Sequence, residues 1–252
     1  MGTTSSTSGG ARATTVEALK FILRQIGRFY NSSSLVGDKP FYEVESFPWV
    51  EKIEANWQVI REELDELLKY REHLPNFQDI SPDQKGLSQD DHWKTFFFYA
   101  YGIKAGNDSD SCPRTLELLH QIPGMKTAFF SIFGPGKHLP PHRGPYNGVL
   151  RYHLGLKVPE PRDQCGIRVQ DEVRHWEEGK SLIFDDTYLH EAWNHTDQDR
   201  VVLFVDFVRP MTFPASMMNS ALIQIIGLSP FVLGAKGNYT AWEERFERIV
   251  ND

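Results

Sequence analysis

Two histidines, His142 and His190, are the residues of this sequence best placed for metal chemistry. Each lies in a dense run of proline, glycine, acidic and aromatic residues, on what we expect to be two different strands. Neutral imidazoles presented from neighbouring strands suit a borderline metal such as iron. Arg200 follows His190 by ten residues, at the start of the apolar run 201–205. An arginine there can hold the far carboxylate of a dicarboxylic acid through a bidentate pair.

Arg151 and His153 add two more polar side chains to the same interior. They lie two residues apart in a run with strand character, so both side chains should point to one face of the sheet. An ordinary core strand would give that face to apolar residues. An unpaired buried charge would cost on the order of several kcal/mol. We therefore expect a bound anion, or a protein carboxylate in its place, beside these basic groups.

The stretch 126–210 resembles the catalytic domain of the aspartyl/asparaginyl β-hydroxylase family of iron(II)- and 2-oxoglutarate-dependent oxygenases. Trp93, in the run 91–96, adds a match upstream, so the resemblance covers about residues 90–210. The matching phrases follow the family's order and spacing: Ser131-Ile132-Phe133, His142 with Gly144-Pro145, the run from Leu150 to Leu156, the run from Trp176 to Lys180, Phe184-Asp185-Asp186, His190-Glu191, and Arg200 leading to Val205-Asp206.

The resemblance implies roles for individual residues. His142 and His190 match the family's iron ligands, and Asp186 matches a carboxylate that orients iron-bound water without binding the metal. Five further residues match positions that line the 2-oxoglutarate pocket: Trp93, Ser131, Arg151, His153 and Arg200. The implied enzyme uses Fe(II), 2-oxoglutarate and O2 to hydroxylate an unactivated C–H bond, and it releases succinate and CO2.

The sequence departs from known patterns at the metal site and on the substrate side. Gly144 stands where iron oxygenases commonly carry the acid of a His-x-Asp ligand pair, although the animal β-hydroxylase also has glycine there. An Arg and a Lys that face the substrate in the animal enzyme correspond to Ser88 and Phe129. The loss of two cations argues against a peptidyl aspartate. The run 142–146 is closer to bacterial family members that hydroxylate an acyl chain of lipid A.

The pattern of residues predicts a mainly β protein with flanking helices. From 127 to 210, short β-rich runs alternate with Gly, Pro and Asp, as in a double-stranded β-helix of the jelly-roll or cupin type. We expect this core to cover about 93–210 of a single domain, 15–252, after a disordered lead, 1–14. The remaining predictions are helices over 16–29, 50–68 (capped at Ser46 and Pro48), 113–122 and 239–250, a loop over 72–92, and a turn role for Asp185.

The amino-acid composition limits the kinds of binding partner that we expect. The net charge of −7 argues against nucleic acid, because phosphate binding needs a positive surface. Two cysteines, Cys112 and Cys165, are too few for a disulfide scaffold, and the Ser/Thr/Gly-rich start is unlike a secretory signal, so a cytoplasmic location is expected. The expected substrate is a small molecule, a peptide or a lipid.

Two questions stay open at the level of sequence. The most apolar run, 221–233, is too short to span a bilayer, and it either packs as a helix or makes a peripheral contact with a membrane interface. The chain is either an active hydroxylase, a catalytically silent small-molecule binding module on the same fold, or a scaffold with an acidic surface. The inward basic residues favour the first of these.

Overall fold

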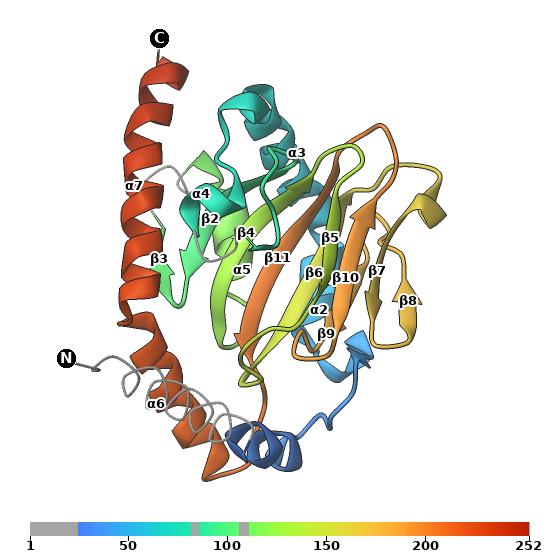
Figure 1. The fold of residues 1–252 in the computed structure, drawn as a ribbon, viewed down its shortest axis with the longest axis vertical. Coiled ribbons are helices and arrows are strands. Elements are labelled where there is room, and N and C mark those ends of the chain that lie inside the picture. Colours follow the sequence, from blue (N-terminus) through green and yellow to red (C-terminus); the bar gives the residue numbers. More distant parts are fainter. Residues whose placement is uncertain (1–24, 82–85, 106–110, 252) are drawn as a thin grey trace, which may run out of the picture.

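Two antiparallel sheets form the centre of the protein in the computed structural model, which describes residues 25–81, 86–105 and 111–251 (Figure 1). The larger sheet contains, in spatial order, β1 (Phe41–Tyr42), β9 (Ser181–Phe184), β6 (Val149–Lys157), β11 (Arg200–Val208), β4 (Met125–Phe133), β2 (Trp93–Ala100) and β3 (Ile103–Lys104). The smaller sheet contains β5 (His138–His142), β10 (His190–Asn194), β7 (Cys165–Val169) and β8 (Glu172–Arg174). The predicted mainly β, jelly-roll type core with flanking helices is confirmed.

The helices that flank this core come mainly from the N-terminal and C-terminal parts of the chain. They are α2 (Trp49–Ala55), α3 (Trp57–Leu67), α4 (Phe77–Ile80), α5 (Pro113–Leu119), α6 (Ala215–Gly227) and α7 (Pro230–Asn251). Residues 25–33 are also helical. The predicted lead 1–14 and most of the helix predicted over 16–29 lie outside the described residues, and the single domain 15–252 stays a prediction. Cys112 and Cys165 are both free and buried.

The helix predicted over 50–68 is in fact two helices that meet at Asn56. The backbone of Asn56 leaves the helical region, with φ −112° and ψ 14°, and its side-chain amide donates to the Lys52 carbonyl oxygen at 2.8 Å. Asparagine often competes with a helix in this way. Pro48 precedes α2 without any side-chain capping bond, so the predicted capping role of Ser46 is wrong.

The loop predicted over 72–92 contains the short helix α4. Phe77 begins this helix, and its ring stacks on Trp93 with centroids 4.3 Å apart. This contact with β2 stabilises one turn of helix. The sequence predicted a loop there because two prolines, Pro75 and Pro82, flank the segment. Local propensity was overridden here by a tertiary contact.

The apolar run 221–233 covers the end of α6 and the start of α7. Ile223 and Gly227 are buried, whereas Ile225 and Leu228 are exposed, so only one face of this segment packs on the protein. No single helix in the described part of the chain is long and apolar enough to cross a bilayer; α6 with 232–246 meets that criterion only as a pair bent by 51°.

A fully buried ion pair joins the C-terminal end of β11 to the turn between β9 and β10. Arg209, just after β11, pairs with Asp185, and neither side chain has any exposed surface. Arg209 also donates to the Tyr42 hydroxyl at 3.0 Å and to the Asn147 carbonyl oxygen at 2.8 Å. Asp185 accepts bonds from the backbone N–H and the hydroxyl of Thr187. The predicted turn role of Asp185 is confirmed, and the turn is anchored through Arg209.

Removing one partner of this pair should destabilise the fold strongly. We expect Asp185→Ala to lower the free energy of unfolding by about 3–5 kcal/mol, because it leaves the Arg209 charge buried without its carboxylate. Denaturant unfolding followed by circular dichroism measures the change. Glu172→Gln is the matched control, since it breaks an exposed pair with Arg174 and should cost less than about 1 kcal/mol. Equal effects from the two variants would contradict the proposed anchoring.

Candidate active site

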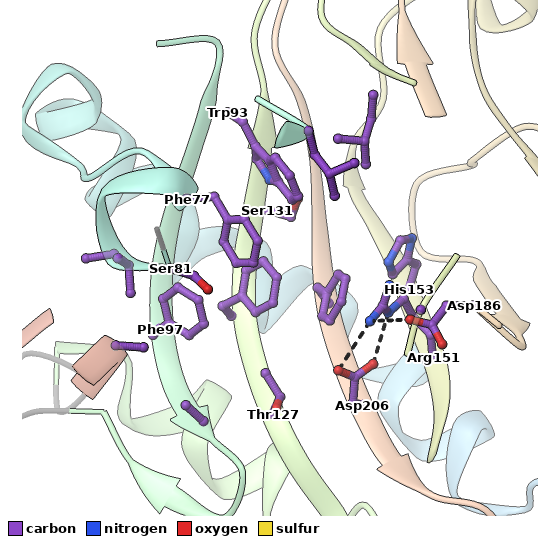
Figure 2. A pocket seen from close by; sticks show the side chains of 18 of the residues that line it. Phe77, Ser81, Trp93, Phe97, Thr127, Ser131, Arg151, His153, Asp186 and Asp206 are labelled. Carbon is purple, nitrogen blue, oxygen red and sulfur yellow. Dashed lines mark hydrogen bonds and ion pairs between the residues drawn. The ribbon is translucent and has the colours of Figure 1, made fainter. Parts of the chain in front are cut away.

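A cavity of about 530 Å³ is lined by residues of both sheets, by α7 and by the turns around α4. It brings together all eight residues that the sequence singled out, although they span more than 100 positions of the chain. Figure 2 shows one view of it, with the charged groups on one side and the aromatic rings on the other. The eight are Trp93, Ser131, His142, Arg151, His153, Asp186, His190 and Arg200.

His142 and His190 lie opposite each other on paired strands. The register of β5 and β10 pairs them directly, and their ring centroids are 4.0 Å apart. His142 Nδ1 lies 2.8 Å from the Pro140 carbonyl oxygen, and His190 Nδ1 lies 3.0 Å from that of Tyr188. A carbonyl oxygen only accepts, so each Nδ1 carries the hydrogen, and each Nε2 keeps a lone pair.

Burial keeps both imidazoles neutral near pH 7. It lowers the pKa of His142 and lowers that of His190 to about 3. Neutral rings with an available Nε2 have the protonation state that divalent metals require. In the described residues no group of three or more His, Cys, Asp and Glu side chains is arranged to hold a metal, so the donor set offered by the protein is this histidine pair.

Asp186 fills the space that a side chain at position 144 would occupy. A Cβ atom built on Gly144 would collide with the Asp186 carboxylate, and the Gly144 N–H donates to the Asp186 carbonyl oxygen at 2.7 Å. A ligand-bearing residue at position 144 therefore does not fit this arrangement. Burial raises the pKa of Asp186 to about 6, even though the nearby Arg151 guanidinium lowers it.

Arg151 lies between two protein carboxylates. Its guanidinium is 3.0 Å from Asp186 Oδ2 and 3.0 Å from Asp206 Oδ1, as Figure 2 shows, and it stacks over the ring of Phe204 at 4.3 Å. Asp206 faces Arg151 directly across β11 and β6. The anion expected beside Arg151 is thus supplied by the protein, and this arginine positions Asp186.

Arg200 is buried in a different setting. Its guanidinium is stacked 3.9 Å from the ring centre of Phe133 and 4.4 Å from that of Trp176, and it donates to the Ser131 carbonyl oxygen at 3.5 Å. Within the part of the chain that the structure describes, no carboxylate pairs with it, its Nε has no acceptor, and the Cys165 thiol is its other side-chain hydrogen-bond partner. Burial lowers the pKa of Arg200 to about 10, so it is still a cation near neutral pH.

His153 and Trp176 provide further unused polar atoms beside Arg200. Both ring nitrogens of His153 and the indole nitrogen of Trp176 are buried without a partner among the described residues. The pKa of His153 is well below its usual value, mainly because of burial and then because of Arg200. The prediction of two inward cations on β6 is therefore wrong for His153, whose neutral ring packs 5.0 Å from those of Phe184 and Phe204.

These observations fit the groups that the sequence led us to expect. Two Nε2 lone pairs suit Fe(II), and an unpaired guanidinium with orphaned nitrogens around it suits a dicarboxylate such as 2-oxoglutarate. Trp93 and Ser131 bond to each other at 3.2 Å on the same wall. Buried polar atoms without partners are rare in folded proteins and call for a ligand or water.

The other side of the cavity is an aromatic ladder on β2, β4 and β11. Phe97 and Phe129 stack at 4.6 Å, Phe129 and Phe204 stack at 4.2 Å, and Phe77 of α4 stacks on the first two at 6.1 and 5.7 Å. This wall continues to Val232, Ala235 and Tyr239 of α7. It is apolar along its length and suits a hydrocarbon chain.

Sequence reasoning missed three contributors to this site. Asp206 was visible as an acidic residue within an apolar strand, which signals a buried partner for a cation. Trp176 lay in a matching phrase but had no assigned role. The ladder residue Phe77 had no signal, because its helix was predicted to be a loop. Ser88 stands where the animal enzyme carries an Arg, and its hydroxyl accepts a hydrogen bond from the buried Lys137 ammonium at 2.7 Å.

Comparison with known proteins agrees with this geometry. An ornithine lipid ester-linked acyl 2-hydroxylase of Rhizobium tropici is 53% identical over 211 residues, which cover 84% of this chain and 75% of that protein. The human aspartyl/asparaginyl β-hydroxylase is 35% identical over 170 residues, but the match covers only 22% of its length. A solved Pseudomonas putida prolyl-4-hydroxylase matches 61% of this chain and 87% of its own at 17% identity, with a TM-score of 0.42, too low for a functional argument.

A family model settles the relationship. The model described as aspartyl/asparaginyl β-hydroxylase matches residues 54–210, more than half of the chain. That range includes all eight predicted site residues and the strands that carry them. This protein therefore belongs to the aspartyl/asparaginyl β-hydroxylase family.

Proposed function

We propose that this protein is an Fe(II)- and 2-oxoglutarate-dependent hydroxylase whose substrate is an ester-linked acyl chain of a membrane lipid. The observation that carries the proposal is one cavity in which a neutral histidine pair and an unpaired buried arginine adjoin an apolar aromatic wall. The 53% identity to a protein named for acyl 2-hydroxylation of ornithine lipid supports the substrate class.

The residues divide between metal, cosubstrate and positioning. His142 and His190 would hold Fe(II) through Nε2, and Arg200 would pair with the far carboxylate of 2-oxoglutarate near His153 and Trp176. When bound, iron and 2-oxoglutarate activate O2 for hydroxylation of an unactivated C–H bond, with release of succinate and CO2. Asp186, held by Arg151, can accept a hydrogen bond in the space beside Gly144. The surrounding rings exclude water from the target carbon.

The substrate side favours an acyl chain over a peptidyl aspartate. Phe129 is stacked within the ladder and contributes no charge, and Ser88 is occupied by Lys137. At the two positions where the animal β-hydroxylase carries substrate-facing cations, this chain therefore offers a stacked ring and a hydroxyl that is already hydrogen-bonded. A hydrocarbon chain buries apolar surface there, at roughly 25 cal/mol per Å².

Loss of either predicted metal ligand should abolish iron binding. We expect His142→Ala and His190→Ala each to remove the metal-to-ligand charge-transfer band that appears when Fe(II) and 2-oxoglutarate are added anaerobically. His138→Ala is the matched control, because this histidine lies on the same strand as His142 but pairs with Glu191 at the surface. Normal iron content in either variant would refute the ligand assignment. Absence of the band in a folded wild-type protein would favour a silent binding module.

Replacement of Arg200 should separate cosubstrate binding from stability. We expect Arg200→Met to weaken 2-oxoglutarate binding by about 100-fold or more, with Fe(II) still bound, since the charged partner of the far carboxylate is lost. The free energy of unfolding without ligands should stay equal or rise, because the variant removes a buried charge that has no carboxylate partner among the described residues. Calorimetric titration and denaturant unfolding measure the two effects. Unchanged affinity would show that the carboxylate clamp lies elsewhere.

A bulky residue in the apolar wall should restrict the acyl chain. Ala235 is half-buried on α7 and lines the cavity. We expect Ala235→Trp to lower succinate release with long-chain lipid by about tenfold or more, with little effect on a short-chain analogue or on binding of 2-oxoglutarate. Ala241→Trp, exposed on the same helix, is the control. Mass spectrometry should find one added oxygen on the acyl chain. Turnover of an aspartyl peptide instead of lipid would overturn the proposed substrate.

A further inference from the structure

The surface around α6 has an unusual concentration of apolar side chains. Six of the eleven large apolar side chains that are exposed in the described chain lie between Phe213 and Leu233. They are Phe213, Met217, Met218, Ile225, Leu228 and Leu233, which we call the α6 surface. No charged residue occurs from Met211 to Ala235. Exposed helices of soluble proteins normally carry charged residues on their outer face, and a continuous apolar surface marks an interaction site.

Specific contacts on the inner face of α6 fix the orientation of the helix. The opposite face of α6 is packed through Ala215, Asn219, Ile223 and Gly227, which recur every four residues and are all buried. Asn219 donates to the Gly148 carbonyl oxygen at 2.7 Å and accepts from the Tyr146 hydroxyl. The orientation of the helix is therefore fixed by specific polar contacts, and these contacts leave the apolar face outside.

The helix adjoins two segments that line the cavity. Asn219 bonds to Tyr146 and Gly148, just after the lining residues Gly144 and Pro145, and a Cβ atom built on Gly227 would lie 3.5 Å from the carbonyl oxygen of Tyr101, which also lines the cavity. The cavity residues that reach solvent include Arg143 and Pro145 near the first contact and Lys104 and Lys236 near the second. Figure 1 shows α6 below the strands, joined to the start of α7, whose residues line the cavity.

We propose that the α6 surface docks on a lipid bilayer that contains anionic lipids. An apolar helix face would enter the interface between headgroups and acyl chains, and three exposed cations, Arg143, Lys104 and Lys236, would face the headgroups. The cavity opening would then lie at the depth where an acyl chain can leave the bilayer. This inference rests in part on the proposed lipid substrate, because only such a substrate requires the opening to face a membrane.

Vesicle binding by the full chain tests this without any turnover. Wild-type protein should float with vesicles of phosphatidylcholine and phosphatidylglycerol, and less with phosphatidylcholine alone. We expect the double variant Met217→Glu, Ile225→Glu to partition about tenfold or more weakly, since two apolar side chains are lost from the contact and two negative charges are added. The control is Val173→Glu, Ile249→Glu, which changes two exposed apolar residues on β8 and at the far end of α7 and should bind like wild type.

Three results would overturn the docking surface. The first is wild-type protein that does not float, and the second is a Met217→Glu, Ile225→Glu variant that floats as well as wild type. The third is a wild-type dimer in sedimentation velocity that this variant dissociates without any vesicle binding, which would make the surface an interface between copies of the chain. If vesicles bind but Fe(II) and 2-oxoglutarate give no charge-transfer band, the proposed hydroxylase function fails and the docking surface stands.

Discussion

The antiparallel register of β5 and β10 is the constraint on which the site depends. It pairs His142 with His190, and the neighbouring carbonyl oxygens of Pro140 and Tyr188 fix both imidazoles with Nε2 available. A slip of one residue would turn one ring to the opposite face of the sheet. The same strand β10 pairs with β7 on its other side, so the register is held from two edges. The strand pairing therefore sets the geometry of the histidine pair that we propose as the metal ligands.

The two buried arginines of the cavity differ in whether a protein carboxylate balances their charge. The charge of Arg151 is balanced by Asp186 and Asp206 without a ligand. Arg200 contacts two aromatic faces, the Ser131 carbonyl oxygen and the Cys165 thiol, and no carboxylate pairs with it among the described residues. A buried cation in that state is destabilising unless an anion joins it. The rings of Phe133 and Trp176 hold the guanidinium in place, and the carboxylate that we propose for it is that of 2-oxoglutarate.

The sequence predicted the site better than the elements that support it. His142, His190 and Arg200 stand out because polar residues in apolar strands need partners, and strand alternation placed Arg151 and His153 on one face. The jelly-roll type core followed from short β-rich runs between Gly, Pro and Asp. The break at Asn56, the helix α4 and the neutrality of His153 could not be predicted from local pattern. Each depends on a tertiary effect: a side-chain bond to Lys52, the stack of Phe77 on Trp93, and burial beside Arg200.

The cavity and the α6 surface together define the route by which we propose that an acyl chain reaches the site. A hydrocarbon chain that moves from a bilayer into a protein through water would lose its apolar environment at about 0.8 kcal/mol per CH2 group. With the α6 surface on a bilayer, as we propose, the chain would pass from one apolar environment to another on its way to the Phe129 and Phe204 ladder, and most of that loss would be avoided. Arg151, Asp186 and Asp206 lie on the other side of the cavity from the ladder, whereas Lys104 of β3 and Lys236 of α7 also line it. In this proposal the uncharged segment from Met211 to Ala235, in an otherwise acidic protein, serves the contact with the membrane.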